Sequence, residues 1–297
     1  MTEPFWERNL LLRVRSGSRA YGLDTPQSDV DSRGVCVPPR RFLLGLSTFE
    51  QHESEGGDHV VYALAKFARL ALEGNPNLIE TLFTEPPDIL HLHPLGERLF
   101  EARRLFLSRR VGQRFGGYAT AQLKRMAGHH RWLNDPPLHQ PGPAEFGARE
   151  HEGGFRFPDT HAERSYQAAL KHWNHYQTWR RQRNPARAAL EERHGYDTKH
   201  AMHLVRLLRM GTEILTDGEV RVRRPDAEEL RAIRAGSLRY EDLLEMARRE
   251  DARIAELEAR SPLPEQPDAE AIETLIEEIQ TEFLFGTDDS CTRPSAP

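Results

Sequence analysis

The aspartates Asp29 and Asp31 most constrain how this chain can fold, because they open an apolar segment that runs to Val37 and ends at two prolines. Side chains at positions i and i+2 of a strand point to the same face, so a strand over residues 29–37 places both carboxylates side by side. Like charges in that position repel unless a cation lies between them. The pair therefore predicts a strand that holds a divalent metal, and a solvated Asp-rich turn is the alternative.

A strand and a sharp turn are expected just before this pair. Residues 9–15 read NLLLRVR, a pattern typical of a half-buried strand, and a Gly17-Ser18 turn follows. Gly17 lets the backbone approach a phosphate, Ser18 adds a hydroxyl, and the Arg19 guanidinium is placed to reach a phosphate oxygen. Ser28, directly before the aspartates, completes this candidate nucleotide-binding set. Phosphoryl transfer from a nucleoside triphosphate needs such a backbone cradle together with metal-binding carboxylates.

A third carboxylate is expected from a neighbouring strand. Asp58 follows a glycine pair and opens the apolar segment DHVVYAL, so it can lie at a strand edge beside the aspartate pair. The two glutamates before the glycine pair are more typical of a solvated turn. Glu80 is a weaker candidate, because it lies within a helix expected over residues 76–83, where a packing or helix-surface charge is the favoured interpretation.

The hydrophobic pattern changes from mixed to helical near residue 95. Before that point, residues 48–53 are expected to form a further strand, and residues 58–61 indicate a strand or the beginning of a helix through Leu72. Beyond it, apolar residues recur at spacings of three and four. Helices are expected over 95–107, 111–127, 162–180, 197–215, 239–258 and 269–284. Residues 134–160 are rich in proline and glycine and indicate a long loop or insertion.

Composition excludes several classes of protein. No apolar run among the 297 residues approaches the roughly 18 needed to span a membrane, and the N-terminus has no secretion signal, so a cytoplasmic location is expected. Cys36 and Cys291 are too far apart in sequence to indicate a disulfide framework or a thiolate zinc site. We expect both cysteines to be reduced.

Charge is segregated along the chain. Residues 101–240 hold 26 Lys and Arg against 16 Asp and Glu, whereas residues 241–297 hold 5 against 16. A basic middle is suited to a polyanion such as a nucleoside triphosphate or RNA, and solvated amphipathic helices rich in arginine are an equally good explanation.

A second basic cluster is expected on the helix that begins near Asp197, a candidate N-cap. Lys199, His203 and Arg206 share one helical stripe, which can grip a triphosphate or an RNA phosphate. A solvated face without function is the alternative. The histidines and aromatic residues of 129–130 and 172–179 can bind metal or stack bases, although helix core and surface is the more common role for such residues. The arginines of 179–187 can contact RNA, with a solvated helix end as the safer interpretation.

These residues together resemble a known family. GSRAYGLDTPQSDVD is similar to the hallmark of the DNA polymerase β-like nucleotidyltransferase superfamily, which is Gly-Ser, a spacer of about ten residues, and Asp-x-Asp. DVDSRG, NPNLIETLF and GYDTKHAMHLVRLLRMG further resemble the bacterial and phage branch associated with RNA ligases and RNA repair, the RlaP type. The joint match covers about residues 10–240, whereas residues 134–160 and the acidic tail match nothing in that pattern.

The resemblance implies an α+β fold. We expect an N-terminal α/β nucleotidyltransferase domain over 1–100, with the mixed sheet of a polymerase β-like palm, a mostly helical domain over 101–285 and a flexible tail over 286–297. It also implies two Mg²⁺ or Mn²⁺ ions held by Asp29, Asp31 and Asp58, with Asp58 helping to deprotonate the attacking hydroxyl. The chemistry would transfer a nucleotide from a nucleoside triphosphate and release pyrophosphate.

The acceptor expected from the resemblance is an RNA 3′ end, including a damaged or tRNA end, with a possible functional association with an RNA ligase. One alternative is the same chemistry on a protein or small molecule, since a fold does not fix its substrate. Another is a non-catalytic nucleotide- or RNA-binding module, which is disfavoured because paired carboxylates repel RNA. A kinase is disfavoured because neither GxxxxGK[ST] nor a protein-kinase loop is present.

Overall fold

The computed structural model describes residues 3–26, 28–183 and 185–286. Contacts divide the chain into two compact units: residues 1–120, 204–232 and 245–297 form the first, and residues 121–203 and 233–244 form the second. These units do not coincide with domains divided near residue 100, because C-terminal helices pack with the sheet-bearing unit. The tail expected over 286–297 lies, apart from Gly286, outside the described residues.

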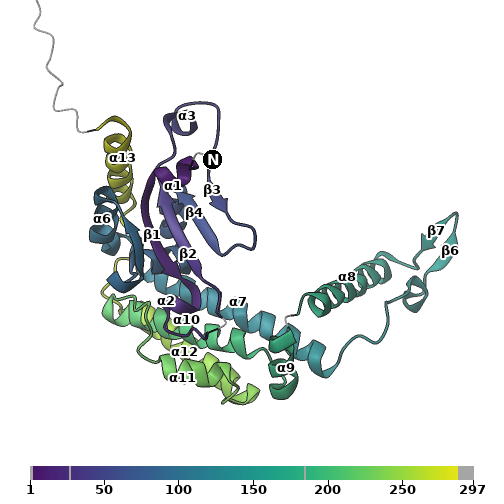
Figure 1. The fold of residues 1–297 in the computed structure, drawn as a ribbon. Coiled ribbons are helices and arrows are strands. Elements are labelled where there is room, and N and C mark those ends of the chain that lie inside the picture. The colour runs from purple at the N-terminus through teal and green to yellow at the C-terminus, as the bar shows by residue number, and fades with distance from the viewer. Residues whose placement is uncertain (1–2, 27, 184, 287–297) are drawn as a thin grey trace, which may run out of the picture. The chain divides into compact units, whose positions relative to one another are not determined.

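A five-stranded mixed sheet organises the first unit (Figure 1). The strands stand in the order β3-β4-β2-β1-β5, with β2 parallel to β4 and the other neighbours antiparallel. Their bounds are β1 Leu10–Ser16, β2 Asp31–Cys36, β3 Gln51–Glu53, β4 His59–Ala63 and β5 Ile89–Leu92. The mixed sheet and the many helices confirm the predicted α+β class.

The core of the first unit forms around β1 and the helix that follows β4. Leu11, Leu12 and Val14 of β1 are buried. In this helix, α4 (Leu64–Leu72), the buried residues recur at the spacing of one helical face, so a single apolar stripe faces the core. Cys36 at the end of β2 is buried and free, and burial raises the pKa of its thiol to about 12, so the thiol stays protonated.

Short helices precede, connect and follow the strands of the first unit. They are α1 Phe5–Arg8, α2 Gly17–Ala20, α3 Arg40–Leu43, α4 Leu64–Leu72, α5 Pro76–Leu82 and α6 Pro94–Glu101, with the 3-10 helices η1 Pro86–Asp88 and η2 Ala102–Phe106. Asn75 begins α5, because its side chain accepts a hydrogen bond from the amide of Asn77 and Pro76 suits the first helical turn.

Longer helices make up most of the remaining chain. They are α7 Arg109–Asn134, α8 Thr160–Gln182, α9 Pro185–His194, α10 Thr198–Asp217, α11 Ala227–Arg234, α12 Tyr240–Arg260 and α13 Ala269–Phe285. Five of the six predicted helical segments are therefore confirmed, and the sixth, 95–107, is divided between α6 and the 3-10 helix η2. Helices α9 and α11 were not predicted. No helix in the described part of the chain is both long and apolar enough to cross a membrane.

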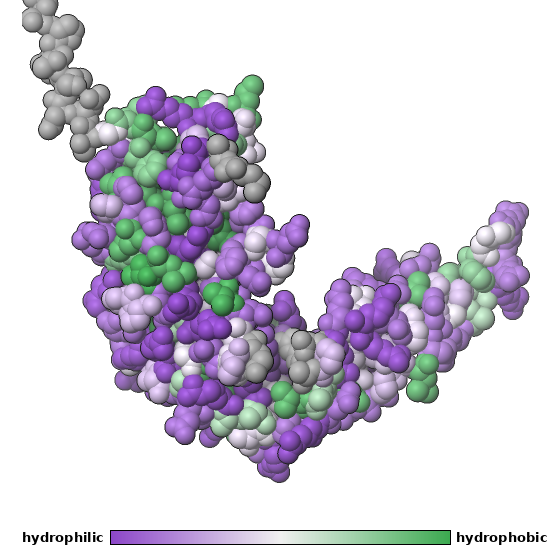
Figure 2. Space-filling view, in the orientation of Figure 1, coloured by the Kyte–Doolittle hydropathy of each residue, from purple (hydrophilic) through white to green (hydrophobic). Residues whose placement is uncertain are grey.

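The second unit has a small aromatic core. Trp132 of α7 packs on Trp179 and Tyr176 of α8, with ring centroids 5.3 and 6.1 Å away. For Tyr176 and Trp179, this packing agrees with the more common role in a helix core. Residues 134–160, predicted as a loop, also contain the 3-10 helix η3 Pro143–Phe146 and a hairpin of β6 Arg149–His151 and β7 Gly154–Arg156. The visible surface of α8 and this hairpin is largely hydrophilic (Figure 2).

Candidate active site

The turn between β1 and α2 brings Gly17 against Asp31. Ser16, the last residue of β1, pairs with Asp31, the first residue of β2. Gly17 follows with φ +66°, a backbone conformation that residues with a side chain rarely adopt. A Cβ built on Gly17 would lie 2.0 Å from Oδ2 of Asp31, so the carboxylate occupies the space that a side chain would need. Glycine is therefore required here on both backbone and steric grounds.

The two paired aspartates have different settings. Strand β2 begins at Asp31, two residues later than the sequence predicts, so Asp29 precedes the ladder. Asp29 is exposed, whereas Asp31 is half-buried. The guanidinium of Arg19 donates hydrogen bonds to the carbonyl oxygens of Ser28 (2.9 Å) and Asp29 (3.2 Å). Arg19 thus holds the loop that carries Asp29, a role that the sequence did not indicate.

Ser28 also acts on this loop. Its hydroxyl accepts a hydrogen bond from the amide of Thr25 at 2.9 Å, and its own amide donates to the carbonyl of Thr25 at 2.9 Å. These bonds join Thr25 to Ser28 just before the aspartates. Ser28 and Arg19 therefore support the position of Asp29, and a contact of either side chain with a nucleotide stays a prediction.

Asp58 immediately precedes β4 and lies next to Asp31, the first residue of β2. Strands β2 and β4 are parallel, in a register that pairs Ser32 with His59. The amide of Ser32 donates to the carbonyl of Asp58 at 2.8 Å, which extends this pairing toward the start of both strands. Asp31 directly precedes Ser32, and Asp58 directly precedes His59, so the two aspartates lie together where the parallel strands β2 and β4 begin. We call this end of the sheet the aspartate edge. Asp58 is exposed there, as is Asp29.

Ser32 and His59 form a contact at this edge that the sequence reasoning missed. The buried Ser32 hydroxyl lies 2.9 Å from Nδ1 of the exposed His59. His59 follows Asp58 directly, and this position was the one signal in the sequence that could have identified it. The imidazole of His59 thus lies beside a candidate metal-binding carboxylate.

The basic residues of α10 do not form one exposed stripe. Lys199 is exposed and His203 is half-buried, and both belong to the second unit. Arg206 belongs to the first unit and is only 4% exposed. The expected stripe is therefore corrected for Arg206, whose side chain lies in the core. A nucleotide contact by Lys199 or His203 stays a prediction.

Arg206 pairs with Glu80 inside the first unit. Nη1 of Arg206 lies 2.5 Å from Oε1 of Glu80, and the Tyr21 hydroxyl donates to Oε2 of Glu80 at 2.6 Å. The guanidinium also lies over the Tyr21 ring, 3.8 Å from its centroid. Burial raises the pKa of Tyr21, as does the charge of Glu80, so the phenol stays a hydrogen-bond donor. Glu80 is thus a packing residue, which confirms the favoured interpretation of its position.

Comparison with known proteins identifies the family. A family model described as RlaP, RNA repair pathway DNA polymerase beta family, matches residues 3–283. The chain belongs to the RlaP family. One curated relative, described as an uncharacterized 38.9 kDa protein in the nrdC-mobD intergenic region of Enterobacteria phage T4, is 35% identical over 86 residues. That alignment spans 25% of this chain and 25% of the phage protein, and no solved structure matches the chain.

The aspartate edge of this RlaP protein has the donor set that a hard divalent cation needs. Carboxylate oxygens are the preferred protein ligands of Mg²⁺ and Mn²⁺, and Asp29, Asp31 and Asp58 offer them from neighbouring segments. The contact of Gly17 with Oδ2 of Asp31 also brings backbone within reach of whatever the carboxylate binds. These carboxylates fit a site for a divalent metal, and phosphate binding by the adjacent Gly17 turn stays a prediction.

Proposed function

We propose that this RlaP protein is a metal-dependent nucleotidyltransferase that transfers a nucleotide from a nucleoside triphosphate to an acceptor hydroxyl, with an RNA 3′ end as acceptor. Membership of a polymerase β-like family linked to RNA repair supports a nucleotidyltransferase-like role. The observation that carries the proposal is the sheet edge where Asp31 lies against Gly17 and next to Asp58 in register. A core or a binding surface alone does not require that arrangement.

Each residue of the edge has a part in this chemistry. Asp29, Asp31 and Asp58 would hold Mg²⁺ or Mn²⁺, which when bound supplies positive charge to the triphosphate and to the attacking oxygen. The backbone at Gly17 and the hydroxyl of Ser18 would orient phosphate oxygens. We infer that the exposed Asp58 accepts the proton of the acceptor hydroxyl. The acceptor oxygen then forms a bond to the α-phosphorus as the bond to pyrophosphate breaks.

RNA is the acceptor class that the chain supports best. The family description connects this group with RNA repair, and the middle of the chain carries an excess of Lys and Arg. Because paired carboxylates repel a polyanion, an RNA end must be held by cationic groups elsewhere on the protein. The second unit offers such groups on α8, where Arg180 and Arg181 are exposed.

The test is transfer of label from α-³²P nucleoside triphosphates. Full-length protein is incubated with each of the four ribonucleotides, Mg²⁺ or Mn²⁺, and total RNA. Asp31→Asn removes a metal ligand without a change in size, and we expect it to reduce labelling by about 100-fold or more, since metal contacts supply several kcal/mol. Glu55→Gln is the matched control, because Glu55 is an exposed carboxylate in the neighbouring loop, and this variant should retain wild-type labelling.

The destination of the label separates the alternatives. Label on RNA that is lost in Asp31→Asn supports the proposal, and the preferred nucleotide follows from the same gels. Label on protein or on small molecules instead of RNA would overturn the RNA acceptor and retain the reaction. Nucleotide binding without release of pyrophosphate under any condition would overturn the enzymatic proposal and favour a binding module.

A further inference from the structure

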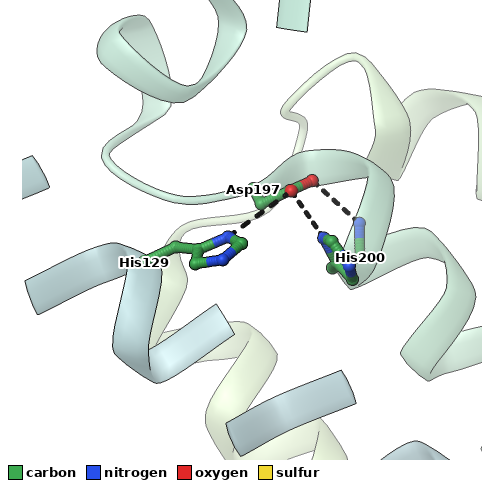
Figure 3. A group of neighbouring side chains, drawn as sticks. All are labelled: His129, Asp197 and His200. Atoms are coloured by element: carbon green, nitrogen blue, oxygen red, sulfur yellow. Dashed lines mark hydrogen bonds and ion pairs between the residues drawn. The ribbon is translucent and has the colours of Figure 1, made fainter. Parts of the chain in front are cut away.

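The second compact unit brings together two histidines and an aspartate that have no part in the proposed transfer reaction. His129 lies on α7, Asp197 immediately precedes α10, and His200 lies in the first turn of α10 (Figure 3). All three belong to the second unit. One donor atom from each, two imidazole nitrogens and one carboxylate oxygen, lies within 4.8 Å of the others.

Asp197 orients the group. Its Oδ1 accepts the amide hydrogen of His200 at 3.0 Å, the N-cap contact that the sequence predicted. Its Oδ2 lies 2.5 Å from Nδ1 of His200 and 3.8 Å from Nδ1 of His129. Oδ1 of Asp197 thus caps the N-terminus of α10, and Oδ2 lies next to both imidazoles. The Asp197 side chain is 1% exposed, so this arrangement is shielded from water.

The buried Nδ1 of His129 lacks a hydrogen bond within the described part of the protein. This nitrogen points toward Oδ2 of Asp197 (Figure 3). A buried ring nitrogen without a hydrogen bond carries a desolvation cost. Its ring is held by neighbours, with centroids 5.6 Å from Trp132 and 5.5 Å from Trp179. A cation between His129 and Asp197 would satisfy this nitrogen where it already lies.

The charges around the group are consistent with a bound cation. Asp197 lies close to Glu191, a second buried carboxylate. Arg183 pairs with Glu191 at 2.9 Å and stacks on Trp179, 4.6 Å from the ring centroid. A divalent ion held by Asp197 would add positive charge beside these two buried carboxylates.

We propose that His129, Asp197 and His200 bind a divalent transition-metal ion, best matched by zinc, which fastens α7 to the beginning of α10. Zinc takes imidazole nitrogen and carboxylate oxygen at about 2.0–2.2 Å, so ligands of a tetrahedral ion stand about 3.4 Å apart. The contacts at 2.5 and 3.8 Å bracket that spacing. Mg²⁺ prefers six oxygen ligands and suits this set poorly. The site goes beyond the proposed transfer reaction and does not depend on it.

The test uses untagged full-length protein stripped of metal with a chelator. Zinc content is measured after dialysis against a small excess of Zn²⁺, and Co²⁺ is used as a spectroscopic probe, because a tetrahedral Co²⁺ site with nitrogen ligands absorbs visible light. His129→Gln and His200→Gln each remove a ligand. Asp197→Asn keeps a helix-capping oxygen while it loses the carboxylate charge. We expect each variant to weaken metal binding by at least about tenfold, the effect typical even of groups outside the ligand set.

Two controls keep the outcome specific. His175→Gln removes an exposed histidine of α8 in the same unit and should bind metal like the wild type. Asp31→Asn/Asp58→Asn removes the aspartate edge and should also retain the tight site. Thermal unfolding separates loss of the site from loss of the fold: the ligand variants should unfold like metal-free wild type, and Zn²⁺ should raise the Tm of the wild type and of both controls by several degrees.

Two results would overturn the proposal. The first is wild-type protein that retains less than a tenth of an equivalent of zinc and shows no visible Co²⁺ absorption. In that case the group is an imidazole–carboxylate pair stabilised without metal. The second is tight binding that disappears in Asp31→Asn/Asp58→Asn and persists in the histidine variants, which would place the metal at the aspartate edge. Neither result depends on whether any RNA is labelled.

Discussion

At the scale of single residues, Gly17 is the position where the candidate active site tolerates least. Alanine there would have φ +66° and a Cβ 2.0 Å from the Asp31 carboxylate. We expect Gly17→Ala to lower nucleotidyl transfer by at least about tenfold, because the carboxylate must move by more than the roughly 1 Å that already impairs catalytic geometry. The accompanying loss of unfolding free energy should be about 1–2 kcal/mol. Labelling assays and urea unfolding measure the two effects.

The matched control for this change is Gly153→Ala. Gly153 has φ +80° in the β6–β7 hairpin, and a Cβ there meets no atom within 4 Å. It therefore shares the backbone cost and lacks the contact with a carboxylate. Equal transfer rates in the two variants would show that the contact between Gly17 and Asp31 does not matter for the reaction.

Arg206 allows a second residue-scale prediction. Arg206→Met leaves the Glu80 carboxylate buried without its cation, and we expect the unfolding free energy to fall by about 3–5 kcal/mol. The control is the exposed Arg260, which pairs with Glu256. Arg260→Met should change the unfolding free energy by no more than about 0.5 kcal/mol. Urea unfolding followed by circular dichroism gives both values. If Arg206→Met had wild-type stability and a raised KM for nucleotide, the result would instead support the prediction that Arg206 contacts a phosphate.

At the scale of elements, the ion pairs before α11 fasten this helix to α10. Arg209 of α10 and Arg224 contact opposite oxygens of Asp226 at 2.5 and 2.8 Å. Burial acts to raise the pKa of Asp226, but hydrogen bonds from the two guanidinium groups outweigh it, and the pKa is lowered. We expect Asp226→Asn to cost about 1–3 kcal/mol of unfolding free energy at neutral pH.

The pH dependence of this cost has a definite sign. Because the folded pKa of Asp226 lies below the unfolded value of about 4, the stabilisation is fully present above the unfolded value. It is lost as pH falls through the folded pKa. The difference between wild type and Asp226→Asn should therefore shrink in acid, which urea unfolding at pH 7 and at the lowest pH where both fold would show. Asp242→Asn, at an exposed pair, should give no measurable difference. A constant gap would contradict the assignment.

The elements were predictable where the sequence carries a local pattern. Strand β1 and helix α4 each have the periodicity of one buried face, and Asn75-Pro76 marks the beginning of α5. Strand β5 was missed because its four residues have no alternation and depend on pairing with β1. Helix α11 was missed because it is only eight residues long, and one of its charges, Glu229, pairs with Arg209 of the distant α10.

The candidate site was predictable to the same degree. Strand geometry pointed to Asp31 from the sequence, and a turn signal pointed to Gly17. The burial of Arg206 was not predictable. Helical spacing shows which side of a helix a residue lies on, but not that its partner, Glu80, lies 126 positions earlier in the chain. The group of His129 with Asp197 and His200 was hidden for the same reason, since it joins two helices that are remote in sequence.

At the scale of the whole molecule, the net charge of −5 predicts repulsion from RNA, whereas the local excess of arginine predicts attraction. Local charge should prevail, because phosphates respond to cations within about a Debye length, roughly 10 Å. Arg180 and Arg181, exposed near the end of α8 on a surface that is largely hydrophilic (Figure 2), are candidates for this contact. We expect Arg180→Glu/Arg181→Glu to weaken binding of single-stranded RNA.

The salt dependence of binding makes this prediction specific. Each phosphate contact with single-stranded nucleic acid contributes about 0.7 to the slope of log K against log salt concentration, so loss of two contacts should reduce the slope by about 1.4. Fluorescence anisotropy with a labelled oligonucleotide between low and moderate salt measures it. Arg248→Glu/Arg249→Glu, an exposed pair on α12, applies the same change in net charge and should leave the slope unaltered if the contact is local. Equal effects of the two double variants would mean that RNA responds to the total charge, and α8 would then have no special part in holding the acceptor.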